Sequence, residues 1–348
     1  VMNSGKQVTV RGNETMELHP VFIEFRNPLK RTLIYSGRGD NPFARVFETL
    51  WVLIAKDNNV EFLEHFLPRA KNYSDDGKRW RAGYPERLRC YGDKKIDQIK
   101  YLYDKLKDDI NTRQAVATLW NPQEDCYADG GKLKESRDFP CSNWLSFLYR
   151  DGNLDCTFAI RSNDLIFGAS HINVYQFSVL QELLAGALGV KVGKFYYLAN
   201  SLHIYSSHFA KAKRIGERSE SKTFLSRDEL PVFRWHQGYN FEDTVEQLCL
   251  IYRRVQGTVG GSEFYSKVRN TYYRDLTEML LEYLLWETDA DGSKTEFHLS
   301  DFIKSYSKYN NTDLKFACAY WLLKKHGIIK KDIELYRVMD WLQENEVW

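Results

Sequence analysis

The sequence lacks the marks of a secreted, metal-binding or membrane-spanning protein. Its six cysteines stand apart and form no C-x-x-C pair, so they indicate neither a disulfide framework nor a zinc site. Its apolar runs are interrupted well short of a membrane span, and its N-terminus has no signal-peptide pattern. We therefore expect a cytoplasmic protein that keeps its thiols reduced.

Charge of neither sign is in excess. The chain has 49 lysines and arginines against 47 aspartates and glutamates, which gives a net charge of +2. This balance argues against a general binder of nucleic acid or membrane surfaces, although it would hide a local basic pocket for a phosphate. With 348 residues, the chain is long enough for one large core or for two domains.

The middle of the chain predicts a β-hairpin with chemistry at its open end. Residues 143–149 and 154–160 have the aromatic and apolar residues of strands, and the sequence R-D-G-N between them is typical of a turn. Cys141 precedes the first strand and Arg161 follows the second, so both come to the same end of the ladder. A guanidinium near a thiol favours the thiolate. The hairpin therefore predicts a cysteine nucleophile beside an anion site.

A second candidate group lies on a predicted helix near residue 48. Asn41 and Pro42 are typical of a helix start, and the residues from Phe43 to Ile54 keep helical spacing for a buried face. Glu48 falls beside this apolar stripe. A carboxylate there is costly unless it is paired or functional. The residues alone leave both possibilities open.

Pattern reading also predicts the remaining elements. We expect short strands at 8–11, 16–18 and 21–25, a strand at 115–120 and one long strand at 193–205. An apolar helix should begin at Asn173 and end at Gly189. Further helices are predicted at 94–110, 241–254, 263–286, 313–325 and 331–344.

Several motifs, in their order along the chain, resemble the thymidylate synthase family, which also contains pyrimidine nucleotide 5-hydroxymethylases. They are E-T-L-W from Glu48, G-Y-P-E-R-L-R from Gly83, T-R-Q-A from Thr112, P-C at Cys141, R-S-N-D from Arg161 and H-I-Y from His203. The resemblance implies an α+β fold, with a thymidylate-synthase-like mixed β-sheet, surrounding helices and a C-terminal helical extension. We expect residues 1–222 to form the catalytic core and residues 223–348 to form the extension packed on it.

The resemblance also implies a reaction. The chain would transfer a one-carbon unit from 5,10-methylenetetrahydrofolate to C5 of a pyrimidine nucleoside monophosphate, after Cys141 adds to C6. Glu48 would organise water and proton transfer at the exocyclic oxygen of the base, and Tyr84 would help to remove the C5 proton. Arg161 would bind the phosphate beside the thiol, and Asp164 would face the pterin.

The remaining implied roles concern the nucleotide. Arg11, with Arg38 as the alternative, would clamp the phosphate, and Ser162 would bind it beside Arg161. Asn173 would read the base, and an amide there favours uracil over cytosine. The sugar would contact His203 and Tyr205, whereas Arg113 would cross to the partner subunit's site and make the enzyme a homodimer.

The sequence favours water over hydride as the group that completes the product. Methylating members of the family close the site with a short C-terminal tail and a tryptophan, and neither is recognisable here. We expect 5-hydroxymethylation of a uracil nucleotide such as dUMP. Thymidylate synthase and a non-catalytic nucleotide-binding scaffold remain as alternatives.

Two features keep alternatives of their own. The polar segment 122–138 is longer than the family leads us to expect, and it is either a solvated loop or a substrate-selecting loop in which Lys132 or Lys134 supplies charge. His171 is either a ligand or a packed imidazole. His203 and His208 lack a third partner at metal spacing, so we expect no metal site.

Overall fold

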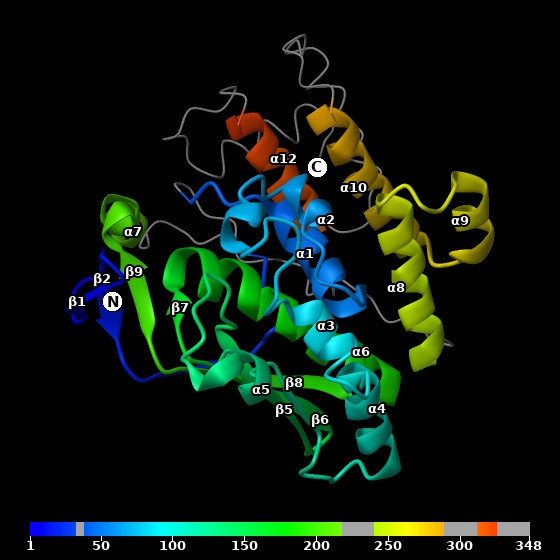
Figure 1. Ribbon diagram of the computed structural model, residues 1–348. Helices are drawn as coiled ribbons and strands as arrows, with labels where there is room; N and C mark the ends of the chain where they lie inside the picture. The colour runs from blue at the N-terminus through cyan, green and yellow to red at the C-terminus, as the bar shows by residue number, and fades with distance from the viewer. Residues whose placement is uncertain (33–37, 218–239, 289–311, 326–348) are drawn as a thin grey trace.

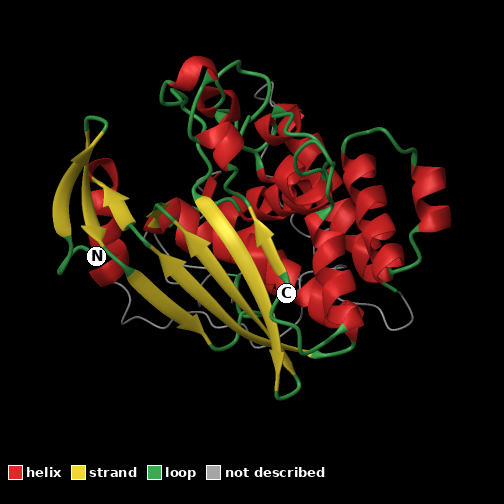
Figure 2. Cartoon of the chain, turned by 60° about the horizontal axis from the view of Figure 1, so that its bottom comes forward, coloured by secondary structure: helices red, strands yellow, loops and turns green. Residues whose placement is uncertain are grey.

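The computed structural model describes residues 1–32, 38–217, 240–288 and 312–325, and it shows an α+β architecture (Figure 1). Two β-sheets lie toward one side of the molecule, and the helices gather on the other, as Figure 2 shows. Within the described ranges, no helix has the length and apolarity needed to cross a membrane.

The larger sheet has five strands in the order β3-β8-β6-β5-β4. Its centre is the predicted hairpin, β5 (Ser142–Arg150) and β6 (Asn153–Ile160), which is confirmed. Asp151 and Gly152 both have positive φ, 51° and 83°, the backbone that a two-residue hairpin turn of this twist requires. The edge strands are β3 (Val21–Phe25) and β4 (Val116–Thr118), and β8 (Lys191–Ala199) lies between β3 and β6 and runs parallel to β6.

The smaller sheet corrects the prediction of one long strand at 193–205. The chain leaves β8 at Ala199 and re-forms as β9 (Leu202–Tyr205), which joins the order β1-β2-β9-β7. The break is held by backbone bonds, because Asn200 N–H donates to Ile160 O at 2.9 Å and Ser201 N–H to Arg161 O at 3.2 Å. The other strands of this sheet are β1 (Lys6–Val10), β2 (Asn13–Leu18) and β7 (Asn163–Asp164).

Helices α1 (Pro42–Ile54) and α6 (Val174–Leu188) pack against each other in the middle of the molecule. The predicted start of α1 is confirmed, since Asn41 Oδ1 accepts from the backbone of Phe43 at 3.0 Å. The predicted end of α6 at Gly189 is also confirmed, with φ 68°. Its start differs: a π-helix, η3 (Leu165–Asn173), leads directly into it.

Helix α4 (Gln98–Asp108) begins four residues later than the pattern at 94–110 predicts. The reason is a cap, because the Asp97 side chain accepts from Lys100 N–H at 3.0 Å, and Lys95 has φ 52°, outside the helical range. The shorter elements are α2 (Glu61–Glu64), η1 (Ala70–Tyr73), α3 (Tyr84–Arg89), α5 (Pro122–Asp125), η2 (Asp129–Gly131), η4 (Ser206–His208) and α7 (Phe209–Glu217).

The C-terminal helices cover the side of α1 that faces away from the sheets (Figure 1). They are α8 (Phe241–Val255), α9 (Gly261–Lys267), α10 (Thr271–Thr288) and α12 (Thr312–Lys325). One continuous helix at 263–286 was the wrong prediction, because the chain breaks between α9 and α10. The predicted helix at 331–344 and the proposed domain boundary at 222/223 lie outside the described residues, so both stay predictions.

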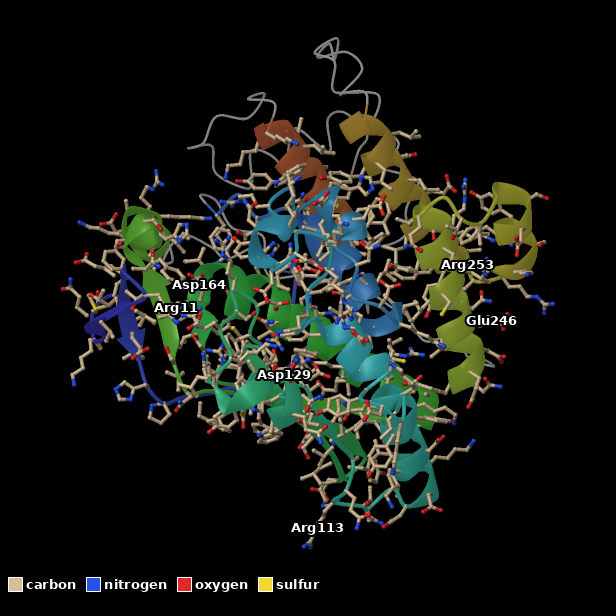
Figure 3. All side chains as sticks on the ribbon, viewed as in Figure 1. Arg11, Arg113, Asp129, Asp164, Glu246 and Arg253 are labelled. Atoms are coloured by element: carbon tan, nitrogen blue, oxygen red, sulfur yellow. The ribbon has the colours of Figure 1, made fainter. Side chains whose placement is uncertain are left out.

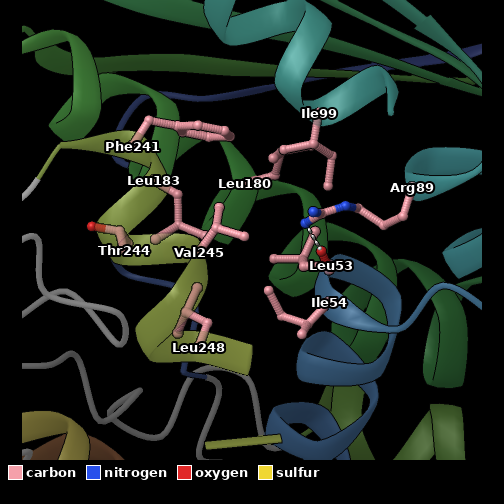
Figure 4. Close-up of a pocket in the computed structure, with 10 residues that line it drawn as sticks. All are labelled: Leu53, Ile54, Arg89, Ile99, Leu180, Leu183, Phe241, Thr244, Val245 and Leu248. Carbon is pink, nitrogen blue, oxygen red and sulfur yellow. Dashed lines mark hydrogen bonds between the residues drawn. The ribbon is translucent and has the colours of Figure 1, made fainter. Parts of the chain in front are cut away.

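Aromatic contacts attach these helices to the rest of the molecule. Phe241 stacks on Tyr103 of α4 with ring centroids 4.4 Å apart, and the ring centroids of Tyr252 and Phe62 are 4.7 Å apart. Figure 4 shows the small apolar gap beneath α8, where Arg89 donates to Leu53 O at 2.9 Å. Since one continuous core cluster includes residues of α1, α6 and α8, the extension shares the core.

Candidate active site

The two ends of the β5–β6 hairpin bring Cys141 and Arg161 together, as the sequence predicts. Arg161 N–H donates to Cys141 O at 2.9 Å, which closes the ladder. The guanidinium folds back over the same loop: its Nε donates to Pro140 O at 2.9 Å, and its Nη2 lies 3.8 Å from Cys141 Sγ. The side chain of Cys141 is partly buried, and no disulfide involves it.

The electrostatics of this thiol are only partly as expected. Burial raises the pKa of Cys141 above its ordinary value, and this effect exceeds the opposing influence of the Arg161 and Arg11 charges. The carboxylate of Asp138 adds to the rise. The guanidinium favours the thiolate, but this effect does not outweigh desolvation.

Tyr84 stands against the base of the cysteine loop. Its hydroxyl accepts from Ser142 N–H at 3.1 Å, so α3 and β5 hold the phenol next to Cys141. Burial raises the pKa of Tyr84 to about 12, and the nearby Cys141 and Glu48 charges act in the same direction. Tyr84 is therefore a neutral phenol that can donate or relay a proton.

Glu48 occupies the α1 position that the sequence singles out, and the structure gives it a partner. Gln176 Nε2 of α6 donates to Glu48 Oε1 at 2.9 Å. Burial raises the pKa of Glu48 to about 7, although the Gln176 bond opposes the rise. A carboxyl with such a pKa can take up and release a proton at neutral pH. Sequence reasoning missed Gln176, although an amide within the most apolar predicted helix was an available signal. The structure buries this side chain completely.

The smaller sheet supplies the opposite wall. Asp164 on β7 pairs in register with His203 on β9, and their ring neighbour Tyr205 lies 5.0 Å from His203 between centroids. Asp164 Oδ1 caps η3 by accepting from Phe167 N–H at 2.7 Å, whereas its buried Oδ2 has no hydrogen-bond partner among the described residues. Burial lowers the pKa of His203, so its imidazole is neutral. This wall offers acceptors and neutral hydrogen-bonding groups.

Asn173 ends η3 and faces the same site through its neighbour Asn163, whose Nδ2 donates to Asn173 Oδ1 at 3.0 Å. Ser162 lies between Arg161 and Asn163 and is partly buried. Asn163 also donates to the Tyr197 hydroxyl, and the charge of Cys141 acts on that tyrosine, so this network lies beside the Cys141–Arg161 pair. The sequence did not single out Asn163, which only the fold connects to Asn173.

Arg11 and its alternative Arg38 have different surroundings. Arg11 is exposed in the β1–β2 turn, with φ 50°, and its charge acts on both Cys141 and Tyr205 (Figure 3). Arg38 is buried and already bound: it pairs with Asp40 and donates to Ser170 Oγ at 3.0 Å. Of the two arginines, only Arg11 therefore has a guanidinium exposed to an incoming anion. Arg38 instead fixes η3.

His171 and Arg113 lie outside the site of their own chain. Burial lowers the pKa of His171 to about 3, which is the behaviour of a packed neutral imidazole. Arg113 lies before β4 at the far end of the molecule from Arg11 and Asp164 (Figure 3). The structure therefore does not bring Arg113 to the site that its own chain forms.

The segment 122–138 is exposed along most of its length, and two carboxylates anchor it to the rest of the molecule. Asp125 is 2% exposed and accepts from both Arg81 and Arg87, at 2.8 Å and 2.6 Å. Asp138 Oδ2 accepts from Ala82 N–H at 3.0 Å. These bonds tie the segment to the residues on both sides of Tyr84. Lys132 is exposed and Lys134 partly so, and a role for either in selecting substrate stays a prediction.

Comparison with known proteins places this geometry in context. A family model described as "Thymidylate synthase" matches residues 40–235. The "Deoxyuridylate hydroxymethyltransferase" of Bacillus phage SP01 is 37% identical over 240 residues, which cover 67% of this chain and 61% of that protein. The protein of the same name from Delftia phage PhiW-14 is 32% identical over 233 residues, covering 66% of this chain and 63% of that protein.

Thymidylate synthases are also similar. The "Thymidylate synthase" of Bacillus licheniformis is 31% identical over 168 residues, covering 46% of this chain and 56% of that protein. The chain thus matches less than two thirds of the length of these curated relatives. The solved thermostable thymidylate synthase A from Bacillus subtilis has a TM-score of 0.53 at 23% identity, covering 65% of this chain and 82% of that one. This likeness confirms the fold class that the sequence predicts.

Proposed function

The chain belongs to the thymidylate synthase family, and we propose that it transfers a one-carbon unit to C5 of a pyrimidine nucleoside monophosphate and completes it with water. The product would be a 5-hydroxymethyl nucleotide, with dUMP as the preferred substrate. Supporting the choice of water, the relatives named deoxyuridylate hydroxymethyltransferase match a larger share of this chain than the thymidylate synthase from Bacillus licheniformis.

The observation that carries the proposal is the meeting of a thiol, a guanidinium, a phenol and a near-neutral carboxyl at one site. Cys141 Sγ lies 3.8 Å from Arg161, and Tyr84 is bonded to the residue that follows the cysteine. Glu48 adds a carboxyl with a pKa of about 7. Nucleophilic activation of a ring carbon followed by proton transfer needs these four groups.

The chemistry of the chain's own residues begins at Cys141. Its sulfur bonds to C6 of the pyrimidine, and the displaced electron pair makes C5 a nucleophile, which then bonds the one-carbon unit. The dianionic phosphate of the nucleotide would bind Arg161, Ser162 and the exposed Arg11. The C5 proton then leaves toward the hydroxyl network of Tyr84.

Glu48 would govern the last step. After C5 loses its proton, the electron pair of that bond forms the double bond to the one-carbon unit, and the nitrogen that carried the unit leaves with its bonding pair. The nucleotide would then carry an exocyclic methylene that accepts a nucleophile. Glu48 in its carboxylate form takes a proton from water, the hydroxide bonds to the methylene carbon, and the returning electron pair expels the Cys141 thiolate. A near-neutral pKa suits this general base, because enough carboxylate is present while its basicity stays high.

The family implies a folate, and one feature of the site fits it. Asp164 Oδ2 is a buried acceptor without a partner among the described residues, as a pterin with donor nitrogens would require. We propose 5,10-methylenetetrahydrofolate, which when bound supplies the one-carbon unit. Asp164 would orient it, and the neighbouring Tyr205 would contact the nucleotide sugar together with His203.

We propose a homodimer as the working form. In the larger sheet, Phe22 and Leu198 leave an apolar face exposed, at 62% and 36%, opposite the helices. A second copy of that face would cover it. Arg113, which lies far from its own Asp164, would then contribute its charge to the partner's phosphate site (Figure 3).

The decisive experiment is incubation of the purified protein with methylenetetrahydrofolate and each of dUMP, UMP, dCMP and CMP, followed by mass spectrometry of the nucleotides. A hydroxymethyl product without dihydrofolate supports the proposal. A methyl product with dihydrofolate would show a thymidylate synthase instead. Nucleotide binding without turnover would leave only a binding protein.

A further inference from the structure

We propose that Asn163 sets the base preference of this enzyme by fixing which way Asn173 presents its amide. The inference rests on the proposed function, in which Asn173 reads the pyrimidine edge. An amide can face a base in two senses that differ by exchange of its oxygen and nitrogen. One sense complements uracil and the other complements cytosine, so the residue that holds the amide decides between them.

The contacts of Asn163 define a single sense. Its Nδ2 donates to Asn173 Oδ1 at 3.0 Å and to the Tyr197 hydroxyl at 2.9 Å. An amide nitrogen has two hydrogens, so these two bonds use both. Asn163 is 6% exposed and Tyr197 is fully buried, which leaves little solvent to exchange the partners. Asn173 must therefore turn its oxygen toward Asn163.

Backbone packing keeps the two amides in place. A Cβ on Gly168 would lie 1.7 Å from Asn163 Oδ1 and 3.0 Å from Asn173 Oδ1, so both amides rest against a surface that only glycine provides. Burial also raises the pKa of Tyr197, which stays a neutral phenol. The arrangement joins the consecutive elements β7 and η3 to β8, which lies further along the chain at Tyr197.

This sense matches uracil. With Oδ1 held on the Asn163 side, its second lone pair can accept the N3–H of uracil, and the Asn173 nitrogen can donate to O4. Cytosine has an acceptor at N3 and a donor at C4. The Asn173 oxygen would therefore face the lone pair of N3, and the Asn173 nitrogen would face the C4 amine. Reading cytosine requires the flipped Asn173, which would leave two donors facing each other at Asn163. Flipping Asn163 as well would remove that clash, but it would turn the amide hydrogens of Asn163 against Gly168, where its oxygen now packs.

Asn163→Asp is the sharpest test, because it replaces the group that donates to Asn173 by one that accepts, in a side chain of nearly the same shape. A carboxylate only accepts, so it would draw the nitrogen of Asn173 toward itself and could still accept from the Tyr197 hydroxyl. We expect the ratio of kcat/KM for dCMP to that for dUMP to rise by about 10- to 100-fold, the effect of moving one buried unpaired polar group from one base to the other. An unchanged ratio would overturn the proposal.

Tyr197→Phe serves as the matched control. It disturbs the same buried network but leaves the Asn163 donor on Asn173, so we expect lower thermal stability and an unchanged preference for dUMP. If this variant shifted the ratio as far as Asn163→Asp does, the assignment to Asn163 would be wrong. Should Asn163→Asp fail to fold, Asn163→Ala decides. Without a side chain that orients Asn173, the ratio of kcat/KM for dUMP to that for dCMP should fall toward one.

Calorimetric binding of dUMP and dCMP without folate separates this inference from the proposed function. Wild-type protein that binds dUMP more tightly, together with an Asn163→Asp protein that reverses the order, supports the inference even if no turnover occurs. If wild-type protein forms the hydroxymethyl product but Asn163→Asp binds and converts both nucleotides in the wild-type ratio, only the inference fails.

Discussion

Glu48 Oε1 accepts a 2.9 Å hydrogen bond from Gln176 Nε2, and this contact joins the two central helices at the proposed site. The two residues are 128 positions apart in the sequence. Burial raises the pKa of the carboxyl to about 7, and the amide restrains the rise because it bonds to the charged form. The packing of α1 on α6 therefore sets the proton affinity of the proposed base.

The first prediction concerns the pH dependence of turnover. Because the base must be ionised, the rate should rise with pH as Glu48 loses its proton near a pKa of about 7. Gln176→Leu removes a bond to the carboxylate, which should raise this pKa by roughly one to two units and move the acid limb to higher pH. Profiles of kcat against pH measure the shift. Gln181→Leu, which removes another buried α6 amide whose bonds go to backbone oxygens, should leave the limb in place.

The second prediction concerns the nucleophile. Cys141→Ala should abolish turnover of dUMP, since no other described thiol lies beside Arg161, whereas dUMP binding should persist because the phosphate ligands remain. Cys249→Ala on α8 is the control and should keep both properties. Turnover near the wild-type rate in Cys141→Ala would remove this residue from the mechanism.

The third prediction tests whether Arg113 acts across subunits. Arg113→Ala and Cys141→Ala should each be inactive alone. Mixing them under conditions that exchange subunits should restore about a quarter of wild-type activity, because half of the dimers become mixed and each then has one intact site. Activity that stays absent in verified mixed dimers would place Arg113 outside the partner's site.

The fourth prediction concerns the C-terminal helices. Phe241 is 5% exposed and stacks on Tyr103 of α4, so Phe241→Ala should lower the free energy of unfolding by about 3–5 kcal/mol. Glu246→Ala, an exposed change on the same helix, should alter it by less than about 0.5 kcal/mol. Denaturant unfolding compares the two. Equal losses would mean that α8 contributes no specific packing to the core.

Local chemistry was readable from the sequence wherever a few neighbouring residues determine the backbone. The R-D-G-N turn fixed the hairpin, Asn41 and Pro42 fixed the start of α1, and Gly189 fixed the end of α6. The hairpin then required Cys141 and Arg161 to meet. These features depend on steric and hydrogen-bonding preferences within about five residues, which tertiary packing seldom overrides.

The sequence could not give the features that depend on which elements face each other. The pattern predicted one strand where the structure has β8 and β9, because the break at Asn200 and Ser201 is stabilised by backbone oxygens of Ile160 and Arg161. From the hairpin pattern we expected Arg161 to favour the thiolate, but the burial that raises the pKa of Cys141 exists only in the folded protein. Desolvation depends on the whole surroundings of a group and has no local pattern.

The sequence by itself therefore determined the family, the hairpin and most of the residues placed at the site. Only the tertiary structure decided the partners that tune them, Gln176 at Glu48 and Asn163 at Asn173. A motif records which groups the chemistry uses. Their protonation and orientation follow from buried hydrogen bonds between different elements, 128 positions apart for Gln176 and Glu48 and ten for Asn163 and Asn173, and those bonds form only when the elements pack.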